Sequence, residues 1–191
     1  MSARSPLAAR LRAACWPAHR DLDRHPLLAP LTAKTLSLAD YAHALAALYA
    51  PQAAFEEALK DFAPPELPPR LPDLAADLAD LKTSPWPLRV FLPPLEDAAA
   101  KLGALYVLEG ANLGAVVIAR QLQKNLPAYA PRRFFTHAGG EARWERFWRF
   151  ATGLGALDAE RISSAAVAVF ACYRTHLDAC WEAHNVRERA G

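Results

Sequence analysis

The chain has 191 residues, enough for one hydrophobic core that buries roughly 70% of the surface exposed by the unfolded chain. Its 22 basic and 20 acidic side chains are spread along the sequence and leave a net charge of +2, which argues against a nucleic-acid partner. Three cysteines without a CxxC motif, and no uninterrupted apolar run near the ~20 residues of a membrane-spanning helix, exclude a disulfide framework and membrane insertion. We therefore expect a soluble, cytoplasmic, single-domain protein over residues 1–191.

Alanine and leucine dominate, and no segment alternates apolar and polar residues as strands do, so the pattern predicts an all-α fold of six helices. The first helix is expected over about residues 6–22, with His19 and Cys15 beside a buried stripe formed by Leu7, Leu11, Ala14, Ala18 and Leu22. Ser37 and Asp40 form a capping box that opens a second helix to about residue 62, bent at Pro51.

Five prolines between residues 64 and 72 predict a loop, followed by a short amphipathic helix over PDLAADLADL and a second proline-rich loop over about residues 83–94. A long helical pattern then runs over residues 95–126 and ends at Pro127. Its Gly103, Gly110 and Gly114 fall on nearly the same helix face, and each costs ~1 kcal/mol relative to alanine. Either something approaches this face closely or the helix bends there.

The last two helices follow a loop that contains Gly139 and Gly140. Trp144, Phe147, Trp148 and Ala151 mark the fifth helix, and the sixth is expected over about residues 158–186. The sixth carries a run at four-residue spacing: Cys172, His176, Cys180 and His184. Because each step of four advances about 40°, the run winds by ~120° and cannot converge on one tetrahedral metal ion, so its cysteines are interpreted as small buried hydrophobes. We expect His25, His43 and His137 near loops or exposed faces, without a role.

His19 and the glycine face together indicate a ligand, although each alone has an ordinary explanation as a surface histidine or a helix contact. A planar macrocycle slides between two helices when one supplies an imidazole to its iron and the other offers bare backbone, so that a small gas can bind opposite.

Four segments carry a resemblance to the haem oxygenase family, in order and over nearly the whole chain. LRAACWPAH resembles the proximal-helix signature, and YVLEGANLGAVVIARQL resembles the distal-helix signature of bacterial members that supply biliverdin to bacteriophytochromes. DYAHALAALYAPQAAFEEAL and FFTHAGGEARWERFW are similar to the second helix and to the loop-plus-tryptophan segment. The resemblance implies a haem oxygenase-like bundle, with haem between the first helix and a kinked distal helix.

The resemblance also assigns candidate site residues. His19 takes the role of axial iron ligand, and Gly110 and Gly114 take the distal glycines over the iron. Arg12 and Arg174 are candidates for the haem propionates. The distal segment departs from the usual Gly-Ser-Thr-Leu-Gly-Gly at Ala111 and Ala115, which leaves Asn112 or backbone groups to hold the water on which oxygen activation depends.

By this resemblance the chain is an iron-dependent oxidoreductase that binds haem as cofactor and substrate. It cleaves haem to biliverdin, CO and Fe2+ with O2 and with electrons from a ferredoxin or a reductase, and a bacteriophytochrome would accept the biliverdin. Two alternatives stay open. One is a non-catalytic haem carrier or sensor, motivated by Ala111 and Ala115. The other is a haem-free relative, like the thiamine-degrading members of the superfamily, which needs a nucleophilic cysteine such as Cys15.

Overall fold

The computed structural model describes residues 5–190, and every regular element in that range is a helix, which confirms the all-α prediction. In chain order the elements are α1 (Pro6–Asp23), the 3₁₀ helix η1 (Ala29–Thr32), α2 (Leu38–Leu59), α3 (Leu71–Asp80), α4 (Ala98–Asn125), α5 (Arg133–Thr136), α6 (Gly140–Gly153) and α7 (Ala159–Ala190).

Two long helices begin where a side chain accepts a hydrogen bond from a free N–H group of the first turn. The Asp97 carboxylate accepts from the Ala100 N–H at 2.7 Å and caps α4. The Ser37 hydroxyl accepts from the Asp40 N–H at 3.0 Å, and it donates to the Asp40 carboxylate at 2.6 Å. The predicted cap of the second helix is therefore confirmed.

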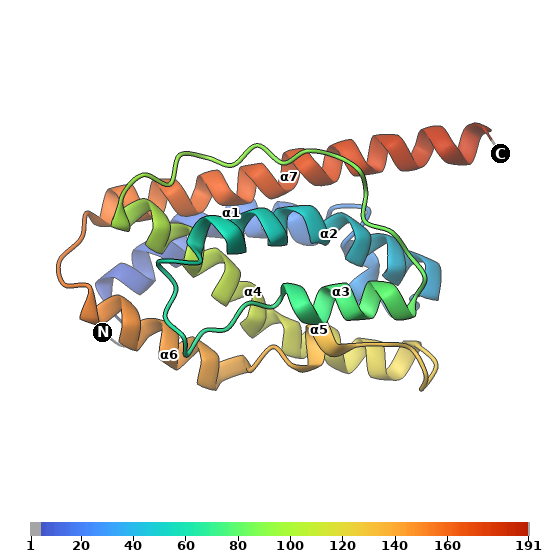
Figure 1. The fold of residues 1–191 in the computed structure, drawn as a ribbon, viewed down its shortest axis with the longest axis horizontal. Coiled ribbons are helices and arrows are strands. Elements are labelled where there is room, and N and C mark those ends of the chain that lie inside the picture. The colour runs from blue at the N-terminus through green and yellow to red at the C-terminus, as the bar shows by residue number, and fades with distance from the viewer. Residues whose placement is uncertain (1–4, 191) are drawn as a thin grey trace.

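The longest helix, α7, is central to the bundle. It packs along both α1 and α4, and α4 also packs against α6. Figure 1 shows α4 crossing the molecule diagonally, from the end where α1 begins toward α5. Two groups of buried side chains form the core, one around Leu11, Phe55 and Phe147 and the other around Leu45, Leu122 and Leu177. Because α7 contributes to both groups, it holds α1 and α4 in place on either side of the site described below.

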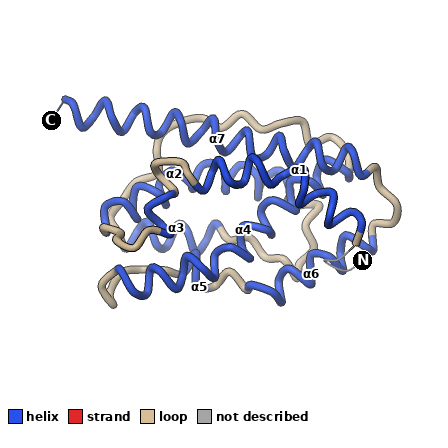
Figure 2. The backbone as a smooth tube through the Cα atoms, turned by 180° about the vertical axis from the view of Figure 1, so that it is seen from behind, coloured by secondary structure: helices blue, strands red, loops and turns tan. Residues whose placement is uncertain are grey.

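The segment between α3 and α4 has no regular structure, as its prolines predict. Figures 1 and 2 show it running along α7 from one end of the bundle toward the other. The Cys172 thiol of α7 donates to the Phe91 carbonyl of this segment at 3.3 Å. The segment is thus attached to α7 part-way along its path.

The structure corrects the sequence prediction in two details. The elements η1 and α5 have four residues each, too few to show a helical period, and the pattern does not predict them. On α1 the predicted buried stripe is wrong at Ala14, which is exposed, whereas Cys15 is 4% exposed. Ala8, Leu11 and Cys15, one turn apart from one another, form the buried line.

One described helix, α4, is long and apolar enough to cross a membrane, with a mean hydropathy of 1.7 over an 18-residue window. Charged residues interrupt α4, so it does not stand out as an unbroken apolar run in the sequence. Half of that window is buried inside the bundle. This burial is typical of a core helix and accounts for its apolar composition.

His25 lies in the turn after α1, near a loop as predicted, but its side chain is buried. Its Nδ1 accepts a hydrogen bond from the Leu27 N–H at 3.2 Å, and its Nε2 lies 3.3 Å from the Asp178 carboxylate on α7. Because Nδ1 is an acceptor here, a neutral ring carries its proton on Nε2, facing that carboxylate. His25 thereby connects the turn after α1 to α7, while His137 is 60% exposed, as predicted.

Burial of His25 and His176 predicts that the protein loses stability in mild acid. Burial lowers the pKa of both rings below the ordinary 6.5, although the Asp178 carboxylate partly opposes this for His25. Below pH 6.5 the unfolded chain then binds more protons than the folded one, so the free energy of unfolding falls as pH falls. Each histidine contributes at most about 1.4 kcal/mol per pH unit.

Urea unfolding at pH 7.5 and pH 5.5 measures this effect. We expect His25→Gln to lose less stability than the wild type between the two values, and His137→Gln to match the wild type. Equal losses for the wild type and His25→Gln would show that His25 does not resist protonation in the fold.

Candidate functional site

His19 lies on α1 with its side chain 48% exposed. Its ring stacks on Trp16, with centroids 6.0 Å apart and an interplanar angle of 15°, and it is tilted against Phe170 of α7 at the same distance. Its Nδ1 lies 3.0 Å from the carboxylate of Asp23, one turn further along α1. A carboxylate at Nδ1 fixes the ring orientation and the tautomer, and it leaves Nε2 for an outside ligand.

The three glycines of α4 have two different surroundings. A Cβ atom on Gly103 would lie 2.4 Å from the Ile162 carbonyl oxygen, so this glycine lets α7 approach closely. At Gly110 the nearest atom would be a ring carbon of Trp144 at 4.0 Å, and among the described residues nothing comes within 4 Å at Gly114. Helix packing therefore explains Gly103, whereas Gly110 and Gly114 leave bare backbone beside open space.

Asn112 lies on the opposite side of α4 from these two glycines and is 7% exposed. Its side-chain oxygen accepts from the Arg70 guanidinium at 2.7 Å, and its amide group donates to Glu109 at 3.4 Å. It lines a cavity of about 360 Å³ between α2, α4 and the loop before α3, together with Gln52 and Glu56. Asn112 thus faces a cavity with both polar and apolar walls and not the exposed glycine face.

A buried ion pair closes the same cavity. The Arg143 guanidinium of α6 donates to both carboxylate oxygens of Glu109 at 2.5 and 2.7 Å, and both side chains are at least 94% buried. Arg143 also donates to the Pro68 carbonyl at 2.8 Å. Two-point pairing of this kind holds a charged group in one orientation. The ion pair therefore forms a fixed part of the cavity wall. It links α6, α4 and the loop before α3.

No protein-family model matches the chain. A haem oxygenase of Xanthomonas campestris pv. campestris (strain 8004) is 44% identical over 57 residues, which are 29% of this chain and only 34% of the relative. The structure of NO- and CO-bound haem oxygenase from Neisseria meningitidis matches 92% of both chains with a TM-score of 0.72 and 23% sequence identity. This chain has the haem oxygenase fold. The predicted all-α, haem oxygenase-like fold class is confirmed.

The two arginines predicted for the haem propionates differ in their surroundings within this haem oxygenase fold. Arg12 is exposed on α1, two turns before His19. Arg174 on α7 is already occupied, because its guanidinium donates to Asp21 of α1 at 2.6 Å and to Asp178 at 2.9 Å. Arg174 therefore remains a candidate for a propionate group, and in this structure it is paired with two carboxylates. The ion pair between Arg174 and Asp21 joins α7 to α1, and Asp21 follows His19 by two residues.

The remaining distal residues differ in burial although they lie close together on α4. Ala111 is exposed and adds no polar atom beside Gly110, whereas Ala115 is 4% exposed and packs in the core. Four residues advance about 40° around the helix, and this small rotation brings Ala115 nearer the core. Of the two departures from the distal signature, Ala111 is thus the one that borders open space.

The cysteines offer no nucleophile. Cys15 is buried, and burial raises the pKa of its thiol to about 11, which keeps it protonated and unreactive at neutral pH. Cys180 is also buried, 3.4 Å from the His176 ring, and burial raises the pKa of its thiol to about 12. Within residues 5–190 no three His, Cys, Asp or Glu side chains group as a metal site. Burial thus disfavours Cys15 as the nucleophile that a thiol-dependent, haem-free relative would need.

Sequence reasoning missed several residues of this site. Asp23 follows His19 by four residues, a spacing that places the two side chains on one helix face and that was visible in the sequence. Trp16 precedes His19 by three residues, so the sequence also placed it on the same helix face as His19. By contrast, Arg70 and Arg143 lie 42 and 34 residues from their partners on α4, and no local pattern connects them.

Proposed function

We propose that this protein is a haem oxygenase, an enzyme that binds haem between α1 and α4 and opens its ring oxidatively. The observation that carries the proposal is the half-exposed His19, oriented by Asp23, in a fold whose other flanking helix presents the bare backbone of Gly110 and Gly114. Haem supplies the iron at which O2 is reduced and is itself the macrocycle that is cleaved, to biliverdin, CO and Fe2+.

The α1 side fits such a ligand. His19 offers Nε2, since Asp23 engages Nδ1, and a neutral imidazole is a common ligand of haem iron. Trp16 stacks on the ring and is 52% exposed, so it offers apolar surface to a macrocycle, whereas Phe170 is 8% exposed and contacts the ring from the core. These residues bind and orient the ligand. Haem bound there would cover part of the exposed indole, which explains why a tryptophan lies at this surface.

The α4 side limits what can stand over the iron. Without side chains at Gly110 and Gly114, a flat ligand and a small gas molecule can both lie against the helix backbone. The helix backbone at these two glycines would be the part of the protein nearest to a gas molecule bound there. Orienting the bound gas against one edge of the macrocycle would be the protein's main contribution to ring opening.

In this proposal the cavity behind α4 holds water, on the side of the helix remote from the glycines. Gln52, Glu56 and Asn112 give it acceptors and donors, and about 360 Å³ is room for several water molecules. Asn112 is held by Arg70, so it acts through water from the side of α4 remote from the glycines and does not touch the ligand. We assign it to the water network as a positioning residue.

The propionate groups would meet arginines at the edge of the site. Arg12 is exposed and able to pair with a carboxylate. Arg174 must exchange its bond with Asp21 for one with a propionate, and we propose that haem binding brings about this exchange.

We further propose that residues 1–191 work as one cytoplasmic domain with an external electron donor, a ferredoxin or a reductase, and that a bacteriophytochrome accepts the biliverdin. The similarity to bacterial haem oxygenases supports the electron donor. The acceptor rests on the resemblance of the distal segment alone.

A haem carrier or sensor is the second candidate, and Ala111 is the observation that favours it. The residue is exposed beside Gly110 and has no polar atom with which to order water. In a carrier, His19 would bind haem as before and the ligand would stay intact.

Titration of the purified chain with hemin, followed by ascorbate in air, separates these functions. We expect a saturable Soret band that decays into the broad red absorption of biliverdin, with CO released. A stable band would establish the carrier instead, and restored turnover in Ala111→Ser would identify the missing polar group as the reason. Absence of a saturable band would contradict both functions.

A further inference from the structure

A buried histidine that the proposed function does not use lies behind the arginine proposed for a propionate group. His25 follows α1, and its side chain is fully buried. Its Nδ1 accepts a hydrogen bond from the Leu27 N–H. Its Nε2 lies 3.3 Å from the Asp178 carboxylate of α7 but forms no aligned hydrogen bond with any described residue. The ring is therefore fixed on one side and incompletely paired on the other.

The Asp178 carboxylate connects this ring to Arg174, one turn earlier on α7. The Nε of Arg174 donates to both oxygens of Asp178 at 2.9 Å, and Nη1 of the same guanidinium donates to Asp21 of α1 at 2.6 Å. The side chain of Arg174 is 39% exposed, whereas that of Asp21 is 60% exposed. The four side chains thus form one continuous cluster, which extends from the buried His25 ring to the surface at Asp21.

The charges in this cluster decide whether the His25 ring holds a second proton. While the ring is neutral, the carboxylates of Asp178 and Asp21 face the single guanidinium of Arg174. Burial lowers the pKa of His25, Asp178 and Asp21 raise it, and Arg174 lowers it. The net effect is a pKa below the ordinary 6.5, so the ring is mostly neutral at pH 7. A change in any partner of Arg174 therefore acts on this ring.

A haem propionate would bring a third carboxylate to the cluster. In the proposed function, Arg174 exchanges its bond with Asp21 for one with a propionate. Asp21 then keeps its negative charge without its cation, and three carboxylates share one guanidinium. An added negative charge favours the charged form of a histidine. His25, already beside Asp178, is placed to supply a second positive charge by taking up a proton from solvent.

We propose that haem binding is coupled to proton uptake by His25, a coupling named here the proton link. When Arg174 turns from Asp21 to a propionate, the His25 ring becomes a cation, its Nε2–H donates to Asp178, and Asp178 keeps Arg174 anchored on α7. His25 and Asp178 are positioning residues, which act through Arg174 and do not touch haem. The proton link rests on the proposed function, because it requires a propionate at Arg174. Binding that takes up a proton strengthens as pH falls, until the ring is already charged in the haem-free chain.

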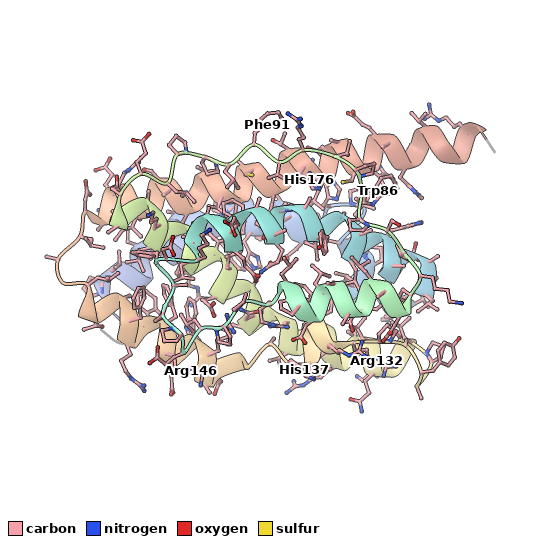
Figure 3. The ribbon with its side chains drawn as sticks, viewed as in Figure 1. Trp86, Phe91, Arg132, His137, Arg146 and His176 are labelled. Carbon is pink, nitrogen blue, oxygen red and sulfur yellow. The ribbon has the colours of Figure 1, made fainter. Side chains whose placement is uncertain are left out.

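Hemin titration of the wild type and of His25→Gln at pH 8 and pH 6 tests the proton link. From pH 8 to pH 6 we expect the affinity of the wild type to rise about threefold relative to that of His25→Gln, a modest effect because solvent screens a partly exposed cluster. Protonation of the proposed ligand His19 weakens binding in both proteins, so it cancels in this ratio. His137→Gln should follow the wild type, since His137 lies at the edge of the molecule opposite α7 (Figure 3).

NMR gives a direct measurement on the wild type, which does not depend on the folding of a variant. The His25 ring should titrate with a higher pKa in the complex with zinc protoporphyrin, a diamagnetic analogue that carries the same propionates, than in the ligand-free chain. His176 is the matched control, because it is buried on the same helix (Figure 3) and no described carboxylate acts on its pKa. In the ligand-free chain, Arg174→Gln should also raise the pKa of His25, since Arg174 lowers it.

The outcomes distinguish the proton link from the proposed function. A wild type without a saturable Soret band contradicts haem binding, and the proton link with it. If the wild type binds hemin but the pKa of His25 is the same with and without zinc protoporphyrin bound, the proton link is overturned and haem binding is not. An affinity ratio between the wild type and folded His25→Gln that stays constant from pH 8 to pH 6 overturns it equally. Circular dichroism shows whether each variant is folded.

Discussion

Replacing His19 by alanine is expected to lower the affinity for hemin by more than about 100-fold and to abolish the ligand-bound Soret spectrum. The removed ring is the proposed iron ligand, and loss of a mere partner of a metal-bound histidine already costs 10–100-fold. Asp23→Asn should therefore have the smaller effect, about tenfold, because it leaves the ring in place but loosens the Nδ1 contact, which is 3.0 Å long. Hemin titration monitored by absorption measures all of these variants.

Two controls make this result specific to His19. His137→Ala removes a histidine that is 60% exposed and paired with Asp73, remote from α1, and it should bind hemin like the wild type. Added imidazole should restore part of the Soret band to His19→Ala, since it can occupy the vacated space at the iron. If His19→Ala kept the spectrum and affinity of the wild type, another residue would be the ligand and the proposed site would be wrong.

Gly103→Ala is expected to destabilise the fold by about 2 kcal/mol. The new Cβ would lie 2.4 Å from the Ile162 carbonyl oxygen and 3.0 Å from the Ala165 Cβ, so α4 and α7 must move apart along their contact. Overpacking of this kind costs about 1–3 kcal/mol or more, and the better helix propensity of alanine returns only about 1 kcal/mol. Urea unfolding of the haem-free chain measures the difference.

Gly114→Ala is the matched control on the same helix. Within the described part of the chain nothing lies within 4 Å of the added Cβ, and the position is exposed. The substitution should therefore stabilise the haem-free chain by about 1 kcal/mol, through helix propensity alone. A Gly103→Ala protein as stable as the wild type would show that α4 and α7 can separate at little cost.

Local chemistry determined much of the fold. Apolar residues at helical spacing predicted α1, α2, α3, α4, α6 and α7, and the Ser37 and Asp40 pair located the start of α2. Hydrogen bonds within a helix and its cap span only three or four residues, so the sequence nearby contains the necessary information. For the same reason, the place of His19 on the first helix, and of Gly110 and Gly114 on the long one, followed from the sequence.

Only the tertiary structure decided what each of these helices meets. It buried His25, engaged Arg174 with Asp21, and turned Asn112 away from the glycine face toward Arg70. It also separated the tight contact at Gly103 from the open backbone at Gly114, although the helix period places both on nearly one face.

The physical reason is that contacts between helices depend on how whole surfaces pack. A four-residue repeat says which side chains share a face, but the neighbour of that face is chosen by the fit of many side chains from distant segments. Arg143 and Glu109 are 34 residues apart, and His43 and His184 belong to α2 and α7. The sequence by itself therefore determined the helices and the candidate ligand His19, while the packing between helices decided which residues form the cavity, the ion pair and the contact between the His43 and His184 rings.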